Sequence, residues 1–509
     1  MKRFFAFLIA VIFTMTLGFT LAETSQGTPP EPPSGSGMTD GQPPEGTPPD
    51  GFGGGELAGQ GGPGNMGGNP PEKPDGEMPG GMGGDPGQGG PGGMGGMGSG
   101  APETYAAVYT FSEDNTLENQ TIASTGTDEN AIHTTAGTTQ VTGGEISRVS
   151  SDSTGGDNAS FYGVGAAALV TGGTLSLENT VITTDSAGGA GVFAYGEGVA
   201  QVKDSTITTY QNTSGGIHVA GGGTLYASNL TVETFGESAA AIRSDRGGGT
   251  MVVEGGSYTS NGLGSPAVYV TADITIRNAT LTATGSEALC LEGKNSVILE
   301  DCSLQGSMQD LSQNDNTWTV ILYQSMSGDA EVGQGSFTMS GGTLSSTNGG
   351  LFYTTNTSSV FTLNHVELQP CEDCEYLLRC TGNSNQRGWG SSGANGANCT
   401  FVAIDQAMEG TILWDSISNL LLSLTEGSVF TGNIADDESC AGNGGSGSCI
   451  VTIDSTSTWI VTGDSQIGSL DNQGTICDEN GNTVSLVKAD GTLISQGNSP
   501  YTITLVGEN

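Results

Sequence analysis

The chain has 509 residues, with 12 basic and 54 acidic side chains and a formal net charge of −42 at pH 7. A charge of that sign and size argues against nucleic acid or an anionic membrane surface as a partner. It favours solubility outside the cell. It also leaves calcium possible as a ligand, because hard cations take clustered oxygen ligands.

The first 22 residues have the pattern of a secretory signal peptide. Two basic residues precede an apolar run over residues 4–19, and Ala22 provides the small residue of a cleavage site. The run is short for a membrane span. We therefore expect a secreted or cell-surface protein whose mature chain begins near Glu23 and has no transmembrane segment.

Residues 23–103 consist mainly of Gly, Pro, Met, Asp and Glu and show neither a strand nor a helix period. So few apolar side chains cannot offset the entropy lost when the backbone is ordered. This segment is predicted to be a disordered linker. Its methionines lack His or Cys companions, so we do not expect a soft-metal site there.

A repeat begins after the linker. Between residues 173 and 303, each repeat has a short apolar/polar alternation, a polar pair ending in Asn, Asp or Gly, and a second alternation. The pair-ending residues are Asn179, Asp204, Asn229, Gly255, Asn278 and Asp301. Further repeats fit at Asn119, Gly143, Gly341, His365, Asp405, about Glu426 and Gly463. Regular spacing of this size, with period-2 strands, predicts an all-β solenoid of about a dozen coils over residues 104–456.

The Asn, Asp and Gly residues at this position are interpreted as turn residues. A tight bend between two strands needs a left-handed backbone, which these three residue types tolerate best. Residues 457–509 keep the strand alternation but lose the coil period. We expect them to form a β-rich cap over the open end of the solenoid.

A two-residue bend of this kind resembles the right-handed parallel β-helix of the pectate-lyase-like superfamily, over most of residues 104–480. The Gly/Met-rich leader and the segment STWIVTGDSQIGSLDNQGTI are similar to bacterial secreted β-helix surface proteins of an adhesin-like, carbohydrate-binding type. The resemblance implies a single-stranded right-handed parallel β-helix. Because such relatives include polysaccharide lyases, glycoside hydrolases, carbohydrate-binding proteins and adhesins, the fold does not choose an activity.

One strand of each coil offers candidate binding residues. Alternation directs one set of side chains inward: Val192, Ile217, Ile242, Val268 and Leu289. The next residues then form an outward column: Phe193, His218, Arg243, Tyr269 and Cys290. The resemblance implies that the outer face of this strand carries a substrate groove. The alternative is that these side chains stack only on one another as cross-strand ladders.

Three insertions flank this face. Residues 148–162 and 305–316 lengthen the connection that enters the strand, and residues 381–398, with Arg387 and Trp389, lengthen one that leaves it. Insertions in solenoids often mark the binding face. Aromatic rings beside arginine suit sugars, and arginine pairs with the carboxylates of acidic sugars. The ligand-binding candidates are therefore Phe193, His218, Arg243, Tyr269, Arg387 and Trp389.

Catalysis is the weaker interpretation. The resemblance to lyases implies calcium held by carboxylates and a basic residue, for which Arg243 is available, but the outward column has no cluster of carboxylates. Hydrolases of this fold need several acids close together, and no nucleophile elbow is present. We assign no catalytic or metal-binding residue. We expect a non-catalytic protein that binds a polysaccharide or a cell-surface glycan; the alternatives are a polysaccharide lyase, a glycoside hydrolase or a purely structural surface protein.

Nine cysteines lie between residues 290 and 477. In an exported chain they favour disulfides. Cys440 and Cys449 would close a glycine-rich loop, and Cys399 would pair with Cys371, Cys374 or Cys380. Those last four could instead bind zinc, but their spacing is irregular and export favours oxidation. An odd number leaves at least one thiol unpaired.

Overall fold

The computed structural model describes residues 100–507. The predicted signal peptide and residues 23–99 of the predicted linker lie outside the described residues. In the described part, strands dominate because short segments alternate between buried and exposed side chains. In Gly223–Ser228, for example, every second residue is buried. Each such strand is too short to form a core alone, so stability comes from stacking one coil on the next.

Most strands belong to long parallel sheets that run the length of the solenoid. The first sheet has 13 strands: β1 (Ala107–Phe111), β4 (Asn130–Thr134), β7 (Ala168–Val170), β10 (Val192–Tyr195), β13 (Ile217–Ala220), β16 (Ile242–Ser244), β19 (Val268–Val270), β22 (Leu289–Glu292), β25 (Trp318–Tyr323), β28 (Gly350–Thr355), β31 (Leu378–Cys380), β34 (Ile412–Trp414) and β37 (Ile434–Asp436). The second sheet has 14 strands: β2 (Asn115–Glu118), β5 (Thr138–Thr142), β8 (Thr174–Glu178), β11 (Val199–Lys203), β14 (Gly223–Ser228), β17 (Gly249–Glu254), β20 (Asp273–Arg277), β23 (Ser296–Glu300), β26 (Gln334–Ser340), β29 (Ser358–Asn364), β32 (Asn398–Ile404), β35 (Asn419–Thr425), β38 (Ser448–Ile453) and β41 (Ser469–Asn472).

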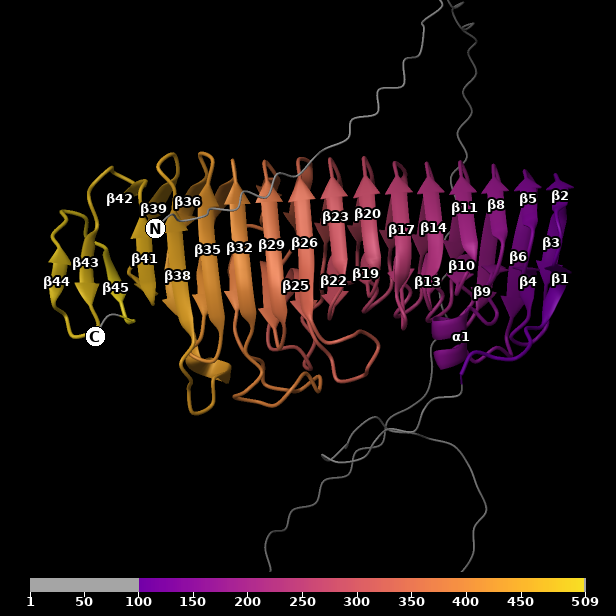
Figure 1. Ribbon diagram of the computed structural model, residues 1–509, viewed down its shortest axis with the longest axis horizontal. Helices are drawn as coiled ribbons and strands as arrows, with labels where there is room; N and C mark the ends of the chain where they lie inside the picture. Colours follow the sequence, from indigo (N-terminus) through magenta and orange to yellow (C-terminus); the bar gives the residue numbers. More distant parts are fainter. Residues whose placement is uncertain (1–99, 508–509) are drawn as a thin grey trace, which may run out of the picture. The chain divides into compact units, whose positions relative to one another are not determined.

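The third face of the solenoid is divided between two sheets. Ten strands form the first of them: β3 (Thr121–Ser124), β6 (Glu145–Ser150), β9 (Val181–Ser186), β12 (Thr206–Thr209), β15 (Thr231–Thr234), β18 (Ser257–Ser260), β21 (Thr280–Ala283), β24 (Ser303–Gly306), β27 (Thr343–Ser346) and β30 (Glu367–Gln369). Four more form the second: β33 (Ala407–Glu409), β36 (Val429–Gly432), β39 (Thr458–Val461) and β42 (Thr475–Asp478). Figure 1 shows strands of successive coils side by side in sequence order. The expected all-β parallel solenoid is therefore confirmed.

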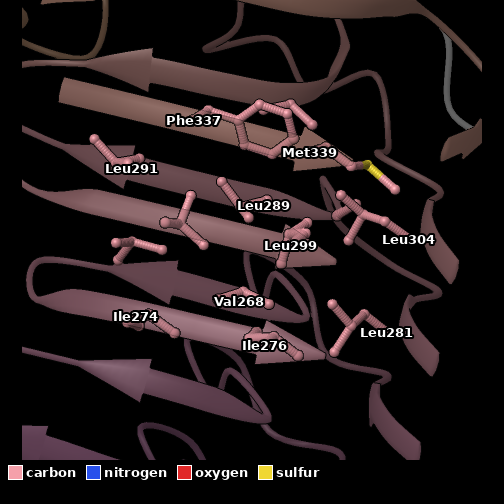
Figure 2. Close-up of a cluster of buried hydrophobic side chains, with 14 of the residues drawn as sticks. Val268, Ile274, Ile276, Leu281, Leu289, Leu291, Leu299, Leu304, Phe337 and Met339 are labelled. Atoms are coloured by element: carbon pink, nitrogen blue, oxygen red, sulfur yellow. The ribbon is translucent and has the colours of Figure 1, made fainter. Parts of the chain in front are cut away.

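The core is a continuous column of apolar side chains inside the coils. The five residues expected to point inward are all fully buried: Val192, Ile217, Ile242, Val268 and Leu289. Figure 2 shows this packing, with aliphatic side chains of successive coils stacked above one another. Further along the column, the rings of Phe352, Phe361 and Phe401 pack with centroids 5.5–5.7 Å apart. Each coil thus buries the apolar surface of its neighbours.

The predicted turn residues do adopt the left-handed conformation. Twelve of them have φ between 47° and 68°: Asn119, Gly143, Asn179, Asp204, Asn229, Gly255, Asn278, Asp301, Gly341, His365, Asp405 and Glu426. Gly463 is the exception, because its φ is not positive. In that coil the residue that directly follows the second strand, β38, is Asp454. Side chains also bond along this row: Asn229 Nδ2 donates to Asp204 Oδ1 at 3.2 Å. The row is turn structure, as interpreted from the sequence.

The coils run further than the predicted boundary at residue 456. β39, β41 and β42 pair in parallel with strands of the preceding coils, so coil structure continues to Asp478. A small sheet then joins a strand within the last coil, β40 (Ser465–Ile467), to three strands that lie after residue 478, in the order β45 (Thr502–Leu505), β43 (Ser485–Lys488) and, at the edge, β44 (Leu493–Ser495). Between residues 100 and 507, no helix has the length and apolar character needed to cross a membrane.

Candidate functional site

The outward column of the first sheet exists in the expected register. Phe193 pairs with His218, His218 with Arg243, Arg243 with Tyr269, and Tyr269 with Cys290. The column continues in both directions along the sheet, through His133 and Leu169 on one side and Ile321, Tyr353 and Arg379 on the other. Successive coils thus present one side chain each on the outer face.

This face is not the open groove that the sequence suggested. Phe193 is 0% exposed and His218 is 1% exposed. The insertion over residues 148–162 folds back on them through helix α1 (Asp157–Tyr162), which ends at Gly163 in a left-handed conformation. A Cβ at Gly163 would lie 2.8 Å from the Phe193 ring, so the backbone itself covers that side chain. Phe193 is therefore core for the insertion rather than an exposed binding residue.

Arg243 lies at the point where α1 meets the sheet. Its Nε lies 2.7 Å from Asp245 Oδ2, and its Nη1 donates to the backbone oxygen of Ser238 at 2.6 Å. Its Nη2 donates to Ser160 Oγ on α1 at 3.1 Å. Arg243 is only 8% exposed. The guanidinium is committed to these partners, so its main role is to hold the insertion against the sheet.

The His218 side chain packs beneath the carboxylate of Asp245. Its Nε2 lies 3.0 Å from Asp245 Oδ2, although neither ring nitrogen completes a well-aligned hydrogen bond. Its ring lies 4.1 Å from that of Phe193. Burial lowers the pKa of His218 to about 4, so the imidazole is neutral at pH 7. Burial would raise the pKa of Asp245, but the neighbouring Arg243 charge and the His218 contact leave it below the ordinary value.

A second arginine joins two insertions. The Arg246 guanidinium lies 4.1 Å from the centre of the Phe161 ring on α1. Its Nη2 also pairs with Asp329 Oδ1 at 2.8 Å. Asp329 belongs to residues 324–333, which connect β25 to β26. Cation–π and ionic contacts thus link α1 to a connection more than 160 residues later in the chain.

Tyr269 is held by a buried carboxylate. Its hydroxyl donates to Glu292 Oε2 at 3.0 Å, and the Tyr323 hydroxyl donates to the same oxygen at 3.1 Å. The Ser325 hydroxyl bonds the other carboxylate oxygen. Burial raises the pKa of both tyrosines well above the ordinary value, so both hydroxyls stay protonated donors. The ring of Tyr269 is fixed in orientation as a result.

Between these groups lies an open cavity of about 270 Å³. Arg243 and Tyr269 contribute from the sheet, and Asp245 directly follows β16. The remaining lining residues come from α1, from the connections that enter β16 and β19, and from the segment after β25: Ser160, Phe161, Ser238, Ala240, Gly264, Pro266 and Asp329. Apolar rings and hydrogen-bonding groups therefore converge on one recess of the first-sheet face. Among the expected ligand residues, the structure brings only Arg243 and Tyr269 to this recess.

Arg387 and Trp389 lie elsewhere on the face. The Trp389 ring packs on Tyr323 at 4.4 Å and on Trp318 at 6.1 Å, and the Arg387 guanidinium lies 5.5 Å from the Trp389 ring. The space that these residues enclose with neighbouring side chains is about 10 Å³. That volume holds about one water molecule. The pair thus closes over the face and does not extend the Arg243 cavity.

All nine cysteines are free thiols in the structure, and the expected Cys440–Cys449 disulfide is not formed. Cys449 points into the core, whereas Cys440 ends the 3₁₀ turn Glu438–Cys440 at the surface. Within the range that the structure describes, no three His, Cys, Asp or Glu side chains are grouped so that they could hold a metal ion. Neither the calcium nor the zinc alternative gains a ligand set there.

Several site residues were missed from the sequence. Ser160 and Asp329 lie in insertions, and no period predicts where such residues fold. Glu292 lies two residues after Cys290 in the same strand, so extending the outward alternation by one step would have found it. An exposed aromatic pair was also missed: the rings of Tyr210 and Phe235 stack at 5.4 Å and are 48% and 42% exposed. Both come directly after strands of the third face.

Comparison with known proteins supports the fold. Residues 148–309 match the family model described as a right handed beta helix region. The matched part includes α1, Arg243, Tyr269 and Glu292. Neither a curated protein nor a solved structure matches the chain. The stacked parallel sheets make the described part of this chain a parallel β-helix, and the family match over residues 148–309 agrees with that fold.

Proposed function

We propose that this is an exported, non-catalytic protein that binds a saccharide in the cavity beside Arg243 and Tyr269. The observation that carries the proposal is the cavity itself, where two aromatic rings and several hydroxyl and carboxylate groups meet on one face of the solenoid. Sugars present apolar ring faces edged with hydroxyls, and ligand sites commonly combine an apolar lining with a few placed polar groups. The signal-like first 22 residues support export.

The charges favour a neutral saccharide over the acidic one that the sequence suggested. Arg243 pairs with Asp245, and Arg246 pairs with Asp329. The cavity therefore has no unpaired arginine to bind a sugar carboxylate. The formal net charge of −42 would also repel a polyanion at a distance.

The dimensions favour a chain end or a branch. At about 270 Å³ the cavity lies near the lower limit of ligand pockets, which is about 300 Å³. Ser160 and Phe161 of α1 and Asp329 of the connection after β25 line the cavity, and Arg246 contacts both segments. We infer that one or two sugar units enter the recess.

The exposed aromatic pair could extend this site. Phe235 and the cavity residue Ser238 share the connection between β15 and β16, and Tyr210 stacks on Phe235 from the preceding coil. A longer saccharide that leaves the cavity over this connection would meet the two rings. We predict that Phe235→Ala weakens binding of a long oligosaccharide several-fold and leaves binding of a monosaccharide unchanged, as measured by titration calorimetry. Equal loss for both lengths would contradict this extension.

The central test is saccharide binding by the full mature chain. A glycan array identifies candidates, and calorimetry then compares Tyr269→Ala with Tyr226→Ala. Tyr226 is 47% exposed on β14 of the second sheet and serves as the matched control. We expect Tyr269→Ala to lower the affinity about tenfold or more, which corresponds to ~1.4 kcal/mol, and Tyr226→Ala to bind normally. Equal binding by the parent, Tyr269→Ala and Tyr226→Ala would reject the cavity as the site.

The same ligands test the non-catalytic part of the proposal. After prolonged incubation with the full chain, we expect neither new reducing ends nor unsaturated products that absorb ultraviolet light. Product formation that Tyr269→Ala abolishes would instead support the lyase or hydrolase alternative.

N-terminal sequencing of the protein recovered outside the producing cells tests export, with a start near Glu23 expected.

A further inference from the structure

Cys380 and Cys399 occupy one corner of a single coil. Cys380 is the last residue of β31 in the first sheet, and Cys399 is the second residue of β32 in the next sheet. Both side chains point into the core, at 0% and 4% exposure. The 18 residues between them are the insertion that carries Arg387 and Trp389.

The preceding coil shows how close side chains at this corner come. Cys380 is in register with Thr354, and Cys399 is in register with Ser359. The hydroxyl oxygens of Thr354 and Ser359 lie 2.9 Å apart. Thr134 and Thr139 make the same corner contact in an earlier coil, at 3.0 Å.

Cys380 Sγ donates to the backbone oxygen of Asn419 at 3.8 Å. A side-chain hydrogen bond with Cys399, followed by burial, raises the pKa of the Cys380 thiol well above the ordinary value. A disulfide needs Cβ atoms about 3.5–4.5 Å apart and side chains that point toward each other. The register places Cys380 and Cys399 at the same corner that brings the Thr354 and Ser359 side chains within 2.9 Å, which is the arrangement that a disulfide needs.

We propose that Cys380 and Cys399 form a disulfide when the chain folds outside the cytoplasm. Both thiols lose their protons, one S–S bond forms, and the two electrons reduce the disulfide of an exported thiol–disulfide oxidoreductase to two thiols. Because the finished coil buries both sulfurs, this exchange takes place before the coil closes. The step rests on the proposed export, since oxidising compartments are where disulfides persist.

The disulfide would fix the base of the insertion over the first-sheet face. Within that insertion, Asn395 Nδ2 donates to the backbone oxygen of Asn383 at 3.0 Å and to that of Trp389 at 2.9 Å. Trp389 in turn packs on Tyr323. The disulfide would close this loop in the unfolded chain as well as in the folded one. Folding would then cost less conformational entropy.

Peptide mapping of the exported full chain tests this inference. Free thiols are alkylated in denaturant without reductant, and the protein is then digested. We expect a peptide containing Cys380 to be linked to one containing Cys399. Cys302 is the matched control, because it is equally buried, at 1%, and bonds only backbone oxygens, so it should be alkylated. Full alkylation of Cys380 and Cys399, or linkage of either to another cysteine, would overturn the proposal.

A double variant tests what the disulfide does. Cys380→Ser with Cys399→Ser reproduces the hydroxyl pair of Thr354 and Ser359, so the coil is expected to fold. We expect trypsin to cut the native variant at Arg387 several-fold faster than it cuts the oxidised parent. An unchanged rate would show that no covalent link restrains the insertion and would contradict the proposed role.

Discussion

One bend residue in each coil sets where the second strand ends and the third begins. Asn229 is representative, with φ of 52° and a side-chain hydrogen bond to Asp204 of the preceding coil. Left-handed backbone costs a residue with an ordinary Cβ roughly 1–2 kcal/mol. Asparagine reduces that cost through local hydrogen bonds, and glycine avoids it. This is why most coils have Asn, Asp or Gly at this position, with His365 and Glu426 as exceptions.

Substitution at this bend should separate conformation from hydrogen bonding. Asn229→Ala is expected to destabilise its coil by about 1 kcal/mol, whereas Asn229→Gly should cost only a few tenths. The thermal unfolding midpoint of the full chain checks the order. Both variants lose the Asn229–Asp204 hydrogen bond, so a midpoint for glycine equal to or below that for alanine would contradict the assigned cost of the left-handed backbone.

Buried histidine gives the fold a dependence on pH. The pKa of His218 is lowered to about 4 in the folded protein, against 6.5 in the unfolded chain, because the site excludes water. Between these values the unfolded state binds more protons, so stability is complete above pH 6.5 and falls as the pH drops toward 4. At about 1.4 kcal/mol per pKa unit, the loss from His218 is about 3 kcal/mol at most.

A His218→Gln variant should therefore show a smaller fall in unfolding midpoint between pH 7 and pH 4 than the parent. His133, whose pKa burial also lowers to about 4, contributes in the same direction. His365 is exposed and paired only with Asp405 at the surface, so His365→Gln is the control. If His218→Gln and the parent lose stability in parallel, the burial of a neutral imidazole is not the cause.

At the scale of elements, the insertions decide what the outer face becomes. α1 covers Phe193, and residues 381–397 place Trp389 on Tyr323 and Trp318. These insertions fold onto the first sheet because its outward column is rich in apolar and aromatic residues that would otherwise be exposed. The column that looked like a groove in sequence is thus largely the docking surface for the protein's own loops.

Trp389→Ala should loosen its insertion without unfolding the coils. A half-buried tryptophan contributes about 2 kcal/mol through the apolar surface that it removes from water. In the described residues, the backbone of the coil strands makes no hydrogen bond to the Trp389 side chain. The loss of stability should therefore remain local to the insertion. We expect amide hydrogen exchange to rise roughly 30-fold in residues 381–397 and to stay unchanged in β29 and β32. A matching rise in those strands would show that the insertion stabilises the solenoid itself.

At the scale of the whole molecule, stability depends on stacking and on how the ends are closed. Each coil contacts only its neighbours, so a stack ends in unpaired strand edges. At the C-terminal end, the strands β43, β44 and β45, which follow the last coil, form a small additional sheet with β40. Its mixed pairing, with β43 and β44 antiparallel, departs from the parallel stack. That change of pairing ends the solenoid.

Removing this sheet should make the protein associate. A chain that stops at Asp478 lacks β43, β44 and β45, and it leaves β40 without its partner. We expect concentration-dependent oligomers by light scattering, because the freed edges can recruit a second copy. The full chain at the same concentrations is the comparison. A truncated chain with the same mass in solution and the same unfolding midpoint would show that the sheet does not protect the end.

The sequence alone determined the architecture, because each coil is specified locally. Alternation fixed which side chains enter the core, and bends such as Asn229 fixed the register, so that Phe193, His218, Arg243 and Tyr269 could be aligned correctly in advance. Only the tertiary structure decided which of them remain accessible. The insertions that cover Phe193 and form the cavity beside Tyr269 have no period, and their positions depend on contacts between residues far apart in the chain, such as Ser160 with Arg243 and Arg246 with Asp329.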